Sequence, residues 1–445
     1  MKDMELKSDR IWVTFSRLSL INMLFNIVNP LASLVDIAFL GHLEDITQLG
    51  GVILSTIIFS YLSSPFIPIR ASTNSAIAYA TARKDTKEAF LIIIRSFIIV
   101  GLIGIFILCL QIPIQKISFL LLSGSDAVEI SGQEYFYARI WETPAVLFNF
   151  VISGWLLGKG LNWLAFLTSL IGATSNIIMD YISIIKMDLG SFGAGISTAI
   201  SQYLILLSSF IIVIRQIEFD FSIAQLKESL KLKEIKKILL FNGNLLIRAL
   251  IVISLEASFL NLGAAQDVTF LAINGLLLQI LVFGNRLIGG FEMATQTMVG
   301  YLRVNRQKDK LILLLNLAIY FGVFTALTLS FIPILFPYSL TILTNHTDII
   351  RSFSQYLLWL PWIFVLNALS YIFDAYIIGF QESKFVRNGS LFALICGFLP
   401  LEIVFSIFNN NNILWLSLVM YRFISASVVL VAILKMNKSD QEIRS

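Results

Sequence analysis

Long apolar runs follow one another along the whole chain, separated by short stretches of charged and turn-forming residues. A run of about 17 or more apolar residues is long enough to cross a bilayer as a helix. Twelve runs reach this length, over residues 11–41, 46–80, 88–120, 128–158, 162–186, 191–215, 234–262, 267–302, 311–337, 349–380, 385–408 and 412–435. Polar residues do not alternate with apolar ones as they do in membrane barrels. The pattern therefore predicts an all-α integral membrane protein with twelve transmembrane helices.

The first run carries a polar stripe on an otherwise apolar surface. Its polar residues recur at steps of 4, 3, 4 and 3, in the order Asn22, Asn26, Asn29, Ser33 and Asp36. At about 3.6 residues per turn these positions share one face of a helix. Pro30 cannot donate a backbone hydrogen bond, so we expect a hinge there. A carboxylate near the bilayer centre costs about 3 kcal/mol, and we therefore expect Asp36 to face an internal cavity and bind a cation.

The composition agrees with a membrane protein and excludes most enzymes. Hydrophobic residues make up 57% of the chain, charged residues 13%, and the mean hydropathy is +0.84. No Walker-type glycine-rich loop and no His-Glu-x-x-His sequence is present. We therefore expect no enzyme and no cofactor, and transport driven by an ion gradient. The net charge of +4 comes from short loops, so we expect no nucleic-acid partner.

The distribution of basic residues predicts the orientation in the membrane. Most of the 32 Lys and Arg residues lie in the N-terminus, the even-numbered loops and the C-terminus, whereas the odd-numbered loops hold Lys116, Lys186 and Arg351. By the positive-inside rule both termini face the cytoplasm. We expect a multi-pass protein of the cell (inner) membrane.

The two halves of the chain repeat one another. Two segments match at an offset of 222 and a third at 221: Leu40–Thr47 with Leu262–Thr269, Thr73–Tyr79 with Thr295–Tyr301, and Trp155–Gly158 with Tyr376–Gly379. Six helices per repeat is an even number, so both copies enter the membrane in the same direction and form parallel repeats. This predicts a six-helix bundle over residues 1–217, a cytoplasmic linker over 218–233 and a second bundle over 234–445. Such a pair, with a central cleft, is typical of transporters.

Several motifs resemble those of the multidrug and toxin extrusion (MATE) family. Besides Pro30 and Asp36, they are Asn176-Ile-Ile-Met-Asp180, Gly190-Ser-Phe-Gly-Ala-Gly-Ile-Ser-Thr198, Gly290-Phe-Glu-Met-Ala-Thr-Gln-Thr-Met-Val-Gly300 and Phe373-Asp-Ala-Tyr-Ile-Ile-Gly379. The last two look most like the DinF-type branch. The resemblance covers nearly the whole chain and implies efflux of organic, often cationic compounds in exchange for H⁺ or Na⁺.

The resemblance also implies a cation site in the N-terminal half, formed by Asp36, Asn176, Asp180, Thr198 and, in some members, Asn149. Asn176 and Asp180 are four residues apart and share a helix face. Carboxylate and amide oxygens suit Na⁺, and two close acids suit a shared proton. Asp180 could instead cap or bond a neighbouring helix, and Thr198 could bond back to its own helix.

Further buried acids lie in the C-terminal half. The resemblance makes Glu256 and Asp374 secondary candidates for cation or substrate binding, whereas Arg248 and Arg286 could instead form ion pairs with them. Arg70 and Glu292 match by the repeat and could line the central cleft.

Two more repeat relations concern Asp36 and Asp180. The offset of 222 relates Asp36 to Ser258 and Asp180 to Glu402. The glycines near Glu402 favour an offset of 225, so the second relation stays open.

These features together predict a secondary active antiporter. Its partners would be small organic substrates and the lipid bilayer, and we expect a monomer. A flippase for lipid-linked or polysaccharide precursors from the same superfamily is the alternative. A membrane scaffold would gain nothing from intramembrane acids.

Overall fold

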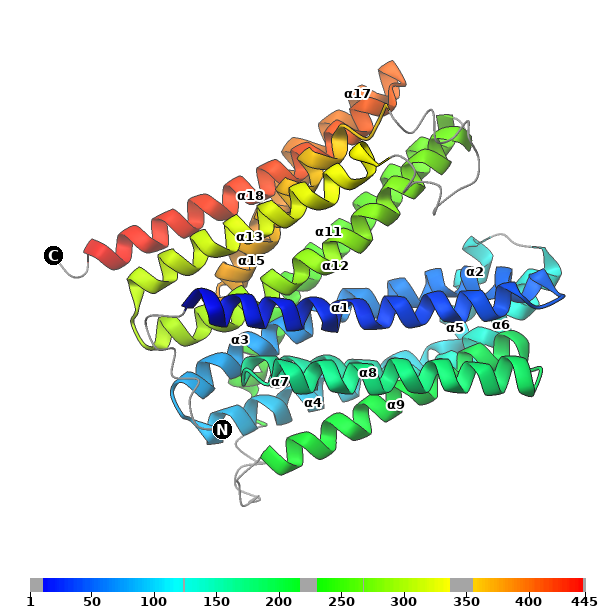
Figure 1. Ribbon diagram of the computed structural model, residues 1–445, viewed down its shortest axis with the longest axis horizontal. Helices are drawn as coiled ribbons and strands as arrows, with labels where there is room; N and C mark the ends of the chain where they lie inside the picture. Colours follow the sequence, from blue (N-terminus) through cyan, green and yellow to red (C-terminus); the bar gives the residue numbers. More distant parts are fainter. Residues whose placement is uncertain (1–10, 123–124, 217–229, 267, 337–354, 443–445) are drawn as a thin grey trace. The chain divides into compact units, whose positions relative to one another are not determined.

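The apolar runs form helices in the computed structural model, which describes residues 11–122, 125–216, 230–266, 268–336 and 355–442 (Figure 1). The N-terminal helices are α1 (Ile11–Gly41), α2 (Ile46–Ser63), η2 (Ser64–Phe66), α3 (Pro68–Ala82), α4 (Thr86–Cys109), α5 (Gln111–Leu121), α6 (Asp126–Arg139), α7 (Glu142–Gly158), α8 (Asn162–Asp180), η3 (Tyr181–Lys186) and α9 (Gly190–Gln216). The C-terminal helices are α11 (Leu232–Gln266), α12 (Val268–Val304), α13 (Lys308–Leu335), α15 (Trp359–Gly379), α16 (Ser383–Ala393), η5 (Leu394–Phe398), α17 (Leu399–Phe408) and α18 (Asn411–Glu442).

The described helices confirm the predicted number of spans. Eleven are long and apolar enough to cross a membrane, and the bent pair α6–α7 brings the number to twelve. The pair bends by 52° at the break between Arg139 and Glu142. Pro144 explains the position of the break, because its ring nitrogen cannot donate to the carbonyl of Ile140.

Prolines and short breaks also divide other predicted spans. The span over 46–80 consists of α2, η2 and α3, with Pro65 and Pro68 at the junctions. The span over 88–120 consists of α4 and α5, which meet at Leu110. These breaks leave each span apolar, so the sequence pattern found the spans without finding their internal turns.

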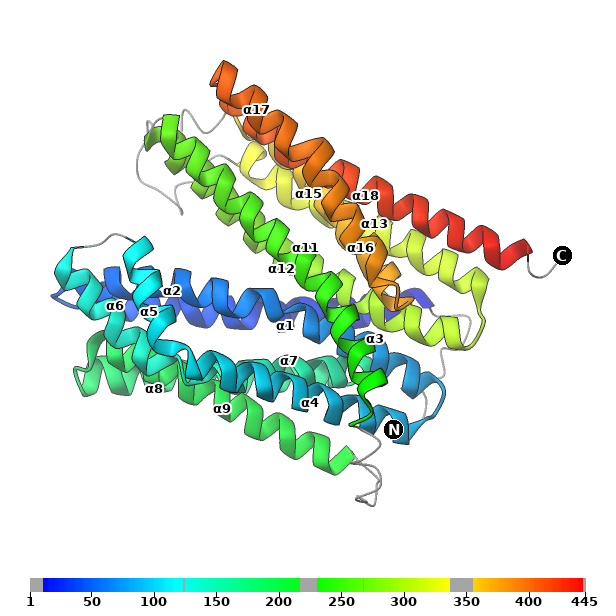
Figure 2. The same ribbon diagram turned by 180° about the vertical axis from the view of Figure 1, so that it is seen from behind.

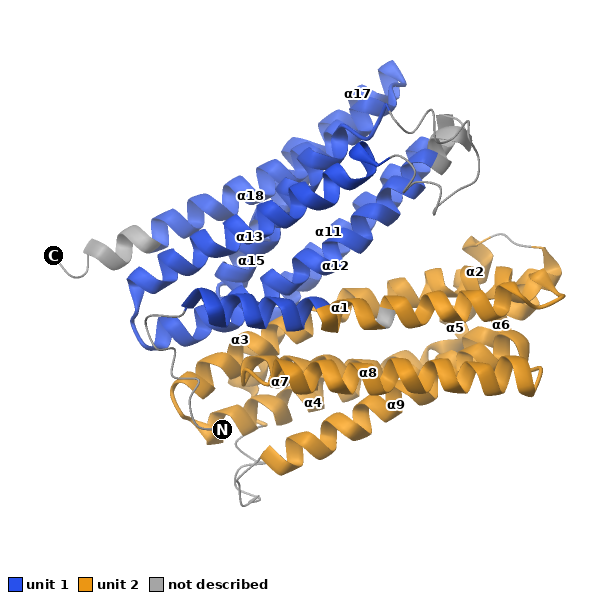
Figure 3. Cartoon of the chain, viewed as in Figure 1, with its two compact units in different colours: residues 1–23, 240–445 blue, residues 24–239 orange. Residues whose placement is uncertain are grey.

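The chain divides into two compact units (Figure 3). One comprises Leu24–Leu239, and the other comprises Met1–Met23 with Leu240–Ser445. The first part of α1 thus packs with the C-terminal helices, whereas the sequence placed all of it in the N-terminal bundle. The predicted bundle boundaries stay a prediction. Most of the linker over 218–233, together with Arg351, lies outside the described residues.

Close helix contacts hold the Leu24–Leu239 unit together. In Figures 1 and 2, α8 and α9 run side by side, and α2 likewise packs on α6. At the α2–α6 contact a Cβ atom on Gly51 would lie 2.4 Å from the backbone nitrogen of Gly132. The two backbones touch because neither position carries a side chain, as is common between membrane helices.

The other unit has an aromatic and amide core. Phe259 of α11 meets Trp415 of α18 edge-on, with ring centroids 5.0 Å apart. The indole of Trp415 donates to Asn274 of α12 (3.0 Å), whose amide in turn exchanges hydrogen bonds with that of Asn411 (2.8 and 3.1 Å). All of these residues are buried, so each polar atom in this layer finds a partner inside the protein, as membrane burial requires.

Candidate functional site

Two carboxylates from different helices meet inside the Leu24–Leu239 unit. Asp36 comes from the second half of α1, and Asp180 ends α8 and is fully buried. The two carboxyl groups lie close enough to interact directly. Asp36 Oδ1 and both Asp180 oxygens are buried and have no hydrogen-bond donor. Carboxylate oxygens only accept, so a proton or a cation between them would turn a repulsive contact into an attractive one.

The local structure around Asp180 fits this role. Asn176, one turn earlier on α8, is 5% exposed, and its amide nitrogen has no hydrogen-bond partner. The α-helix changes to the π-helix η3 directly after Asp180, a feature that often marks functional sites. Ser197 of α9 lies beside Asp180, with its hydroxyl donating to the carbonyl of Gly193 (2.8 Å).

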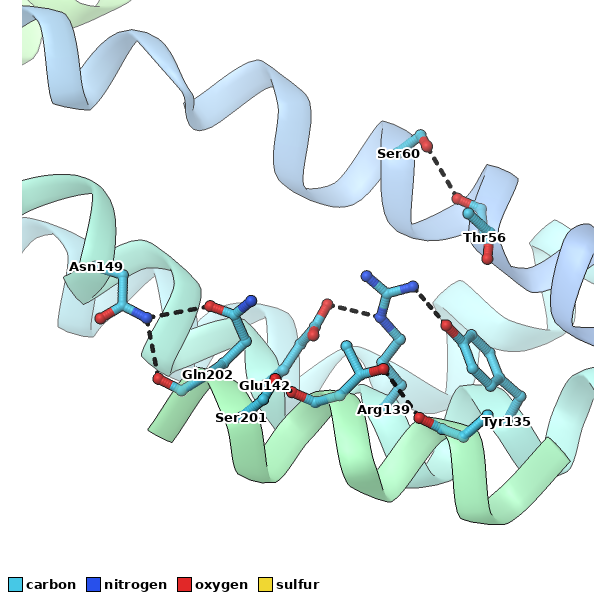
Figure 4. A network of polar contacts seen from close by, with 10 residues as sticks. Thr56, Ser60, Tyr135, Arg139, Glu142, Asn149, Ser201 and Gln202 are labelled. Carbon is cyan, nitrogen blue, oxygen red and sulfur yellow. Dashed lines mark hydrogen bonds and ion pairs between the residues drawn. The ribbon is translucent and has the colours of Figure 1, made fainter. Parts of the chain in front are cut away.

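An ion pair at the α6–α7 break, which Figure 4 shows, joins the partly exposed Arg139 to the buried Glu142. Both residues also interact electrostatically with Asp36 of the acid pair. Arg139 Nε contacts Glu142 Oε1 at 2.8 Å, and its Nη1 donates to the hydroxyl of Tyr135 at 2.6 Å. The guanidinium also lies 4.6 Å from the ring centre of Phe59. Glu142 is 2% exposed, and its Oε2 has no hydrogen-bond partner.

The charges in this region do not balance. Asp36 interacts electrostatically with both Arg139 and Glu142. The guanidinium of Arg139 thus interacts with two carboxyl groups, those of Asp36 and Glu142, and Asp36 also interacts with a third, that of Asp180. A surplus of buried negative charge favours uptake of positive charge.

The sequence analysis did not single out Arg139 or Glu142. Two signals could have found them: their spacing of three residues, and Pro144, which predicts a break where both side chains point inward. Each is common alone, and the apolar run around them reads as one uninterrupted span.

Thr198 and Asn149 are held by other groups. Thr198 Oγ1 donates to the carbonyl of Ala194 at 2.9 Å, which is the back-bond considered as the alternative. The amide of Asn149 donates to the carbonyl (3.0 Å) and side-chain oxygen (3.1 Å) of Gln202 on α9 (Figure 4). Their roles as cation ligands stay predictions.

The site could accept either coupling ion. Within the described part of the chain, no group of three His, Cys, Asp or Glu side chains is arranged to hold a metal. A Na⁺ ion would therefore need the side-chain oxygen of Asn176 in addition to Asp36 and Asp180, and all three supply hard oxygen ligands. A proton would need the two acids alone.

Pro30 lies inside α1, which continues as one helix on both sides of it. The hinge stays a prediction. Arg70 places its guanidinium 5.5 Å from the ring centre of Phe25, and Glu292 interacts electrostatically with Arg248. That Arg70 and Glu292 line a cleft also stays a prediction.

The secondary acids of the C-terminal half, Glu256 and Asp374, both interact electrostatically with Arg422. Asp374 Oδ2 lies 2.5 Å from Arg248 Nη2, as in the ion-pair alternative. The Tyr371 ring lies near two guanidinium groups, that of Arg248 (5.9 Å) and that of Arg422 (5.7 Å). Glu256 lines a cavity of about 40 Å³ together with Arg422, Asn285 and Asn367.

Comparisons with known proteins agree with these features. The profile of the MatE family matches residues 22–182. DNA damage-inducible protein F of Escherichia coli K12 is 25% identical over 397 residues, covering 89% of this chain and 86% of that protein. Multidrug export protein MepA of Staphylococcus aureus MSSA476 is 20% identical, covering 98% and 97%.

Solved structures show the same fold. An outward-facing MATE family transporter superposes with a TM-score of 0.84 at 22% identity, covering 96% of both chains. A MOP superfamily transporter from Pyrococcus furiosus Vc1 has a TM-score of 0.85 at 22% identity, again covering 96% of both.

The described helices are those of a multi-pass membrane protein. The family model and the curated relatives that match the chain support a transporter and not an enzyme. The chain is similar to the MATE family over residues 22–182 and to DNA damage-inducible protein F over most of its length, which supports a MATE transporter of the DinF type.

Proposed function

We propose that this transporter is a secondary active antiporter that exports organic, drug-like and often cationic compounds in exchange for H⁺ or Na⁺. The acid pair Asp36–Asp180 carries the proposal, because its buried oxygens lack a donor and its surroundings hold surplus negative charge. The relative MepA is a multidrug export protein, which supports drug-like compounds as the substrate class.

The coupling follows from electrostatics. When the site faces outward, Asp36 and Asp180 take up the incoming cation, which removes the repulsion between them. The relaxed contact lets the outer part of α1 shift about Pro30, and this shift weakens substrate binding so that the substrate leaves outward. One charge moving through 100 mV supplies about 2.3 kcal/mol, enough to bias two states that differ by a few kcal/mol.

In this proposal the transporter acts as a monomer in the cell membrane, with both termini in the cytoplasm. The basic loops support the orientation. The rival function, flipping of lipid-linked precursors, predicts no efflux of a soluble dye.

Accumulation of ethidium in everted vesicles, which corresponds to efflux from the cell, tests the proposal with either a pH gradient or a Na⁺ gradient imposed. Asp36→Asn keeps the shape of the side chain and removes its charge, so gradient-driven efflux should be lost while the protein still inserts. The matched control is Asp45→Asn. Asp45 is exposed and accepts hydrogen bonds from the backbone nitrogen (2.9 Å) and hydroxyl (2.6 Å) of Thr47 at the start of α2. Asn also caps helices well, so this variant should transport normally.

Gradient-driven efflux retained by Asp36→Asn would refute the role of Asp36. Efflux that responds to the pH gradient but not to the Na⁺ gradient would identify the coupling ion as H⁺, and the reverse result would identify it as Na⁺.

A further inference from the structure

A small cavity lies inside the unit that contains Leu240–Ser445, and two opposite charges line it without pairing. It measures about 40 Å³. Its polar lining comes from α11, α12, α15 and α18 and consists of Glu256, Asn285, Asn367, Tyr421 and Arg422. Arg422 is 7% exposed, yet its guanidinium forms no hydrogen bond or ion pair with a described residue. The cavity therefore holds a buried positive charge whose hydrogen-bond donors are unused.

Aromatic rings hold this guanidinium in place and leave its donors available. It lies over the rings of Tyr371 (5.7 Å) and Tyr421 (5.5 Å). Ring contacts of this kind use the flat faces of a guanidinium, whereas its N–H groups point outward in its plane. By contrast, Arg248 forms an ion pair with Asp374 (2.5 Å). A buried charge without a hydrogen-bond partner is costly, so Arg422 is suited to a ligand that supplies an acceptor.

The other polar groups of the cavity lack donors. Asn367 is 2% exposed and donates to Asn285 Oδ1 at 3.2 Å, while its own Oδ1 is buried without a hydrogen-bond partner. The carboxylate of Glu256 forms no hydrogen bond with a described residue and interacts with Arg422 only through space. A fitting ligand therefore brings an acceptor for Arg422 together with a positive charge for Glu256.

The two charges decide between classes of ligand. A simple organic cation would meet the positive charge of Arg422, and a simple anion would meet the negative charge of Glu256. A zwitterion carries both charges and complements both side chains. A water molecule needs about 10–15 Å³ of cavity volume, so there is room for about three non-hydrogen atoms, the size of a carboxylate group. A carboxylate also matches the planar fork of a guanidinium, with which it forms paired hydrogen bonds.

We propose that this cavity is a substrate subsite in which Arg422 binds the carboxylate of zwitterionic compounds, while Glu256 faces their positive charge. The inference rests on the proposed function for its role in export, and it adds a substrate class to that function. Binding of the zwitterion itself does not depend on antiport.

Two dyes that differ in a single charge test the subsite. Rhodamine B carries a carboxylate and a positive charge, whereas its ethyl ester keeps the positive charge and lacks the negative one. Fluorescence anisotropy measures the binding of each dye to the full chain in nanodiscs of neutral lipid, at neutral pH and without a gradient. The acid should bind about tenfold more tightly than the ester or better, because only the acid forms charge-assisted hydrogen bonds with Arg422.

Variants separate the two ends of the ligand. Arg422→Gln should weaken the binding of rhodamine B by about tenfold or more and should not weaken that of the ester. Glu256→Gln should weaken both dyes by a similar factor, because both carry the positive charge. Arg306→Gln is the matched control: Arg306 is exposed between α12 and α13, so its loss removes the same charge outside the cavity. Its ratio of the two dissociation constants should equal that of the wild type.

Equal affinity of the wild type for acid and ester would overturn the proposal, and so would equal weakening of both dyes by Arg422→Gln. If Arg422→Gln does not fold, as judged by circular dichroism and gel filtration, Arg422→Lys decides. It keeps the charge but loses the fork, so the acid should again lose more affinity than the ester. The ratio of the two dissociation constants is compared between variants in the same nanodiscs, so partition of the dyes into lipid cancels.

The vesicle assay with Asp36→Asn is a separate experiment. Gradient-driven ethidium transport that needs Asp36, together with equal binding of both rhodamines, would support antiport and refute the subsite. Preference for the acid that Arg422→Gln abolishes, together with transport that does not need Asp36, would give the opposite result.

Discussion

The proposed cation uptake of the Leu24–Leu239 unit depends on a few charged side chains. Arg139 is central among them, because it interacts with both Glu142 and Asp36. Its side chain is 19% exposed, and its guanidinium contacts three groups: the Glu142 carboxylate, the Tyr135 hydroxyl and the Phe59 ring. A guanidinium suits this position because its planar fork holds several partners in fixed directions. Without Arg139, the nearby acids would have no fixed positive charge and would compete for the incoming cation.

Replacement of Arg139 by Gln should therefore destabilise the protein strongly, by about 3–5 kcal/mol, because it leaves Glu142 buried without its partner. The double variant Arg139→Gln with Glu142→Gln should recover much of this loss, since no unpaired charge remains. Thermal unfolding in detergent measures both. The control is Glu234→Gln: Glu234 pairs with Lys237 at 2.9 Å, and the two side chains are 32% and 62% exposed, so about 1 kcal/mol or less is expected. A double variant no more stable than Arg139→Gln would contradict the interpretation.

At the scale of helices, backbone contact fixes how the elements of this unit pack. Gly51 on α2 and Gly132 on α6 bring their helices together, and Ser55, one turn after Gly51, donates to the carbonyl of Gly132 at 2.6 Å. The same helix α6 ends at Arg139. The position of the Arg139 guanidinium therefore depends on the contact between Gly51 and Gly132, two turns earlier in α6.

Gly51→Ala should weaken this contact. The new Cβ would lie 2.4 Å from a backbone nitrogen, which cannot move aside as a flexible side chain can, so α6 must shift. We expect a loss of about 1–3 kcal/mol in the unfolding free energy, together with lower dye efflux as Arg139 moves.

Gly243→Ala on α11 is the matched control, because no atom lies within 4 Å of a Cβ built there. Alanine favours helices over glycine by about 1 kcal/mol, so this variant should be neutral or slightly more stable. Equal losses in both variants would mean that the close approach at Gly51 is not what matters.

The sequence predicted the elements better than the contacts between them. Spans follow from apolar length, which is a local property, and all twelve were found. The contact between Asp36 and Asp180 was expected only from the family resemblance. Helical periodicity places each residue on a face of its own helix but does not show which faces meet. Arg139 was missed for the same reason, since its partner Glu142 lies across a break that the apolar pattern hides. Thr198 was expected as a ligand from the resemblance alone, and its hydroxyl donates to the carbonyl of Ala194, so its role as a ligand stays a prediction.

At the scale of the whole molecule, orientation connects the acid pair to the direction of transport. Asp180 lies six residues before the end of its span at Lys186. If the basic loops face the cytoplasm, this end faces outward, and the acid pair would receive protons or cations from outside. An inverted chain would place it at the cytoplasmic end, where an inward gradient could not load it.

Accessibility of single cysteines measures this orientation. After both natural cysteines, Cys109 and Cys396, are replaced by serine, Asn410→Cys introduces a thiol in the exposed loop between α17 and α18, and Thr86→Cys introduces one at the exposed start of α4. A maleimide that cannot cross membranes should label the first variant in intact cells and the second after the cells are opened. Labelling of Thr86→Cys in intact cells would invert the predicted topology, and the outward loading of the acid pair would fail with it. Equal labelling of the two variants in detergent shows that their thiols react alike, so a difference in cells can come only from the membrane barrier.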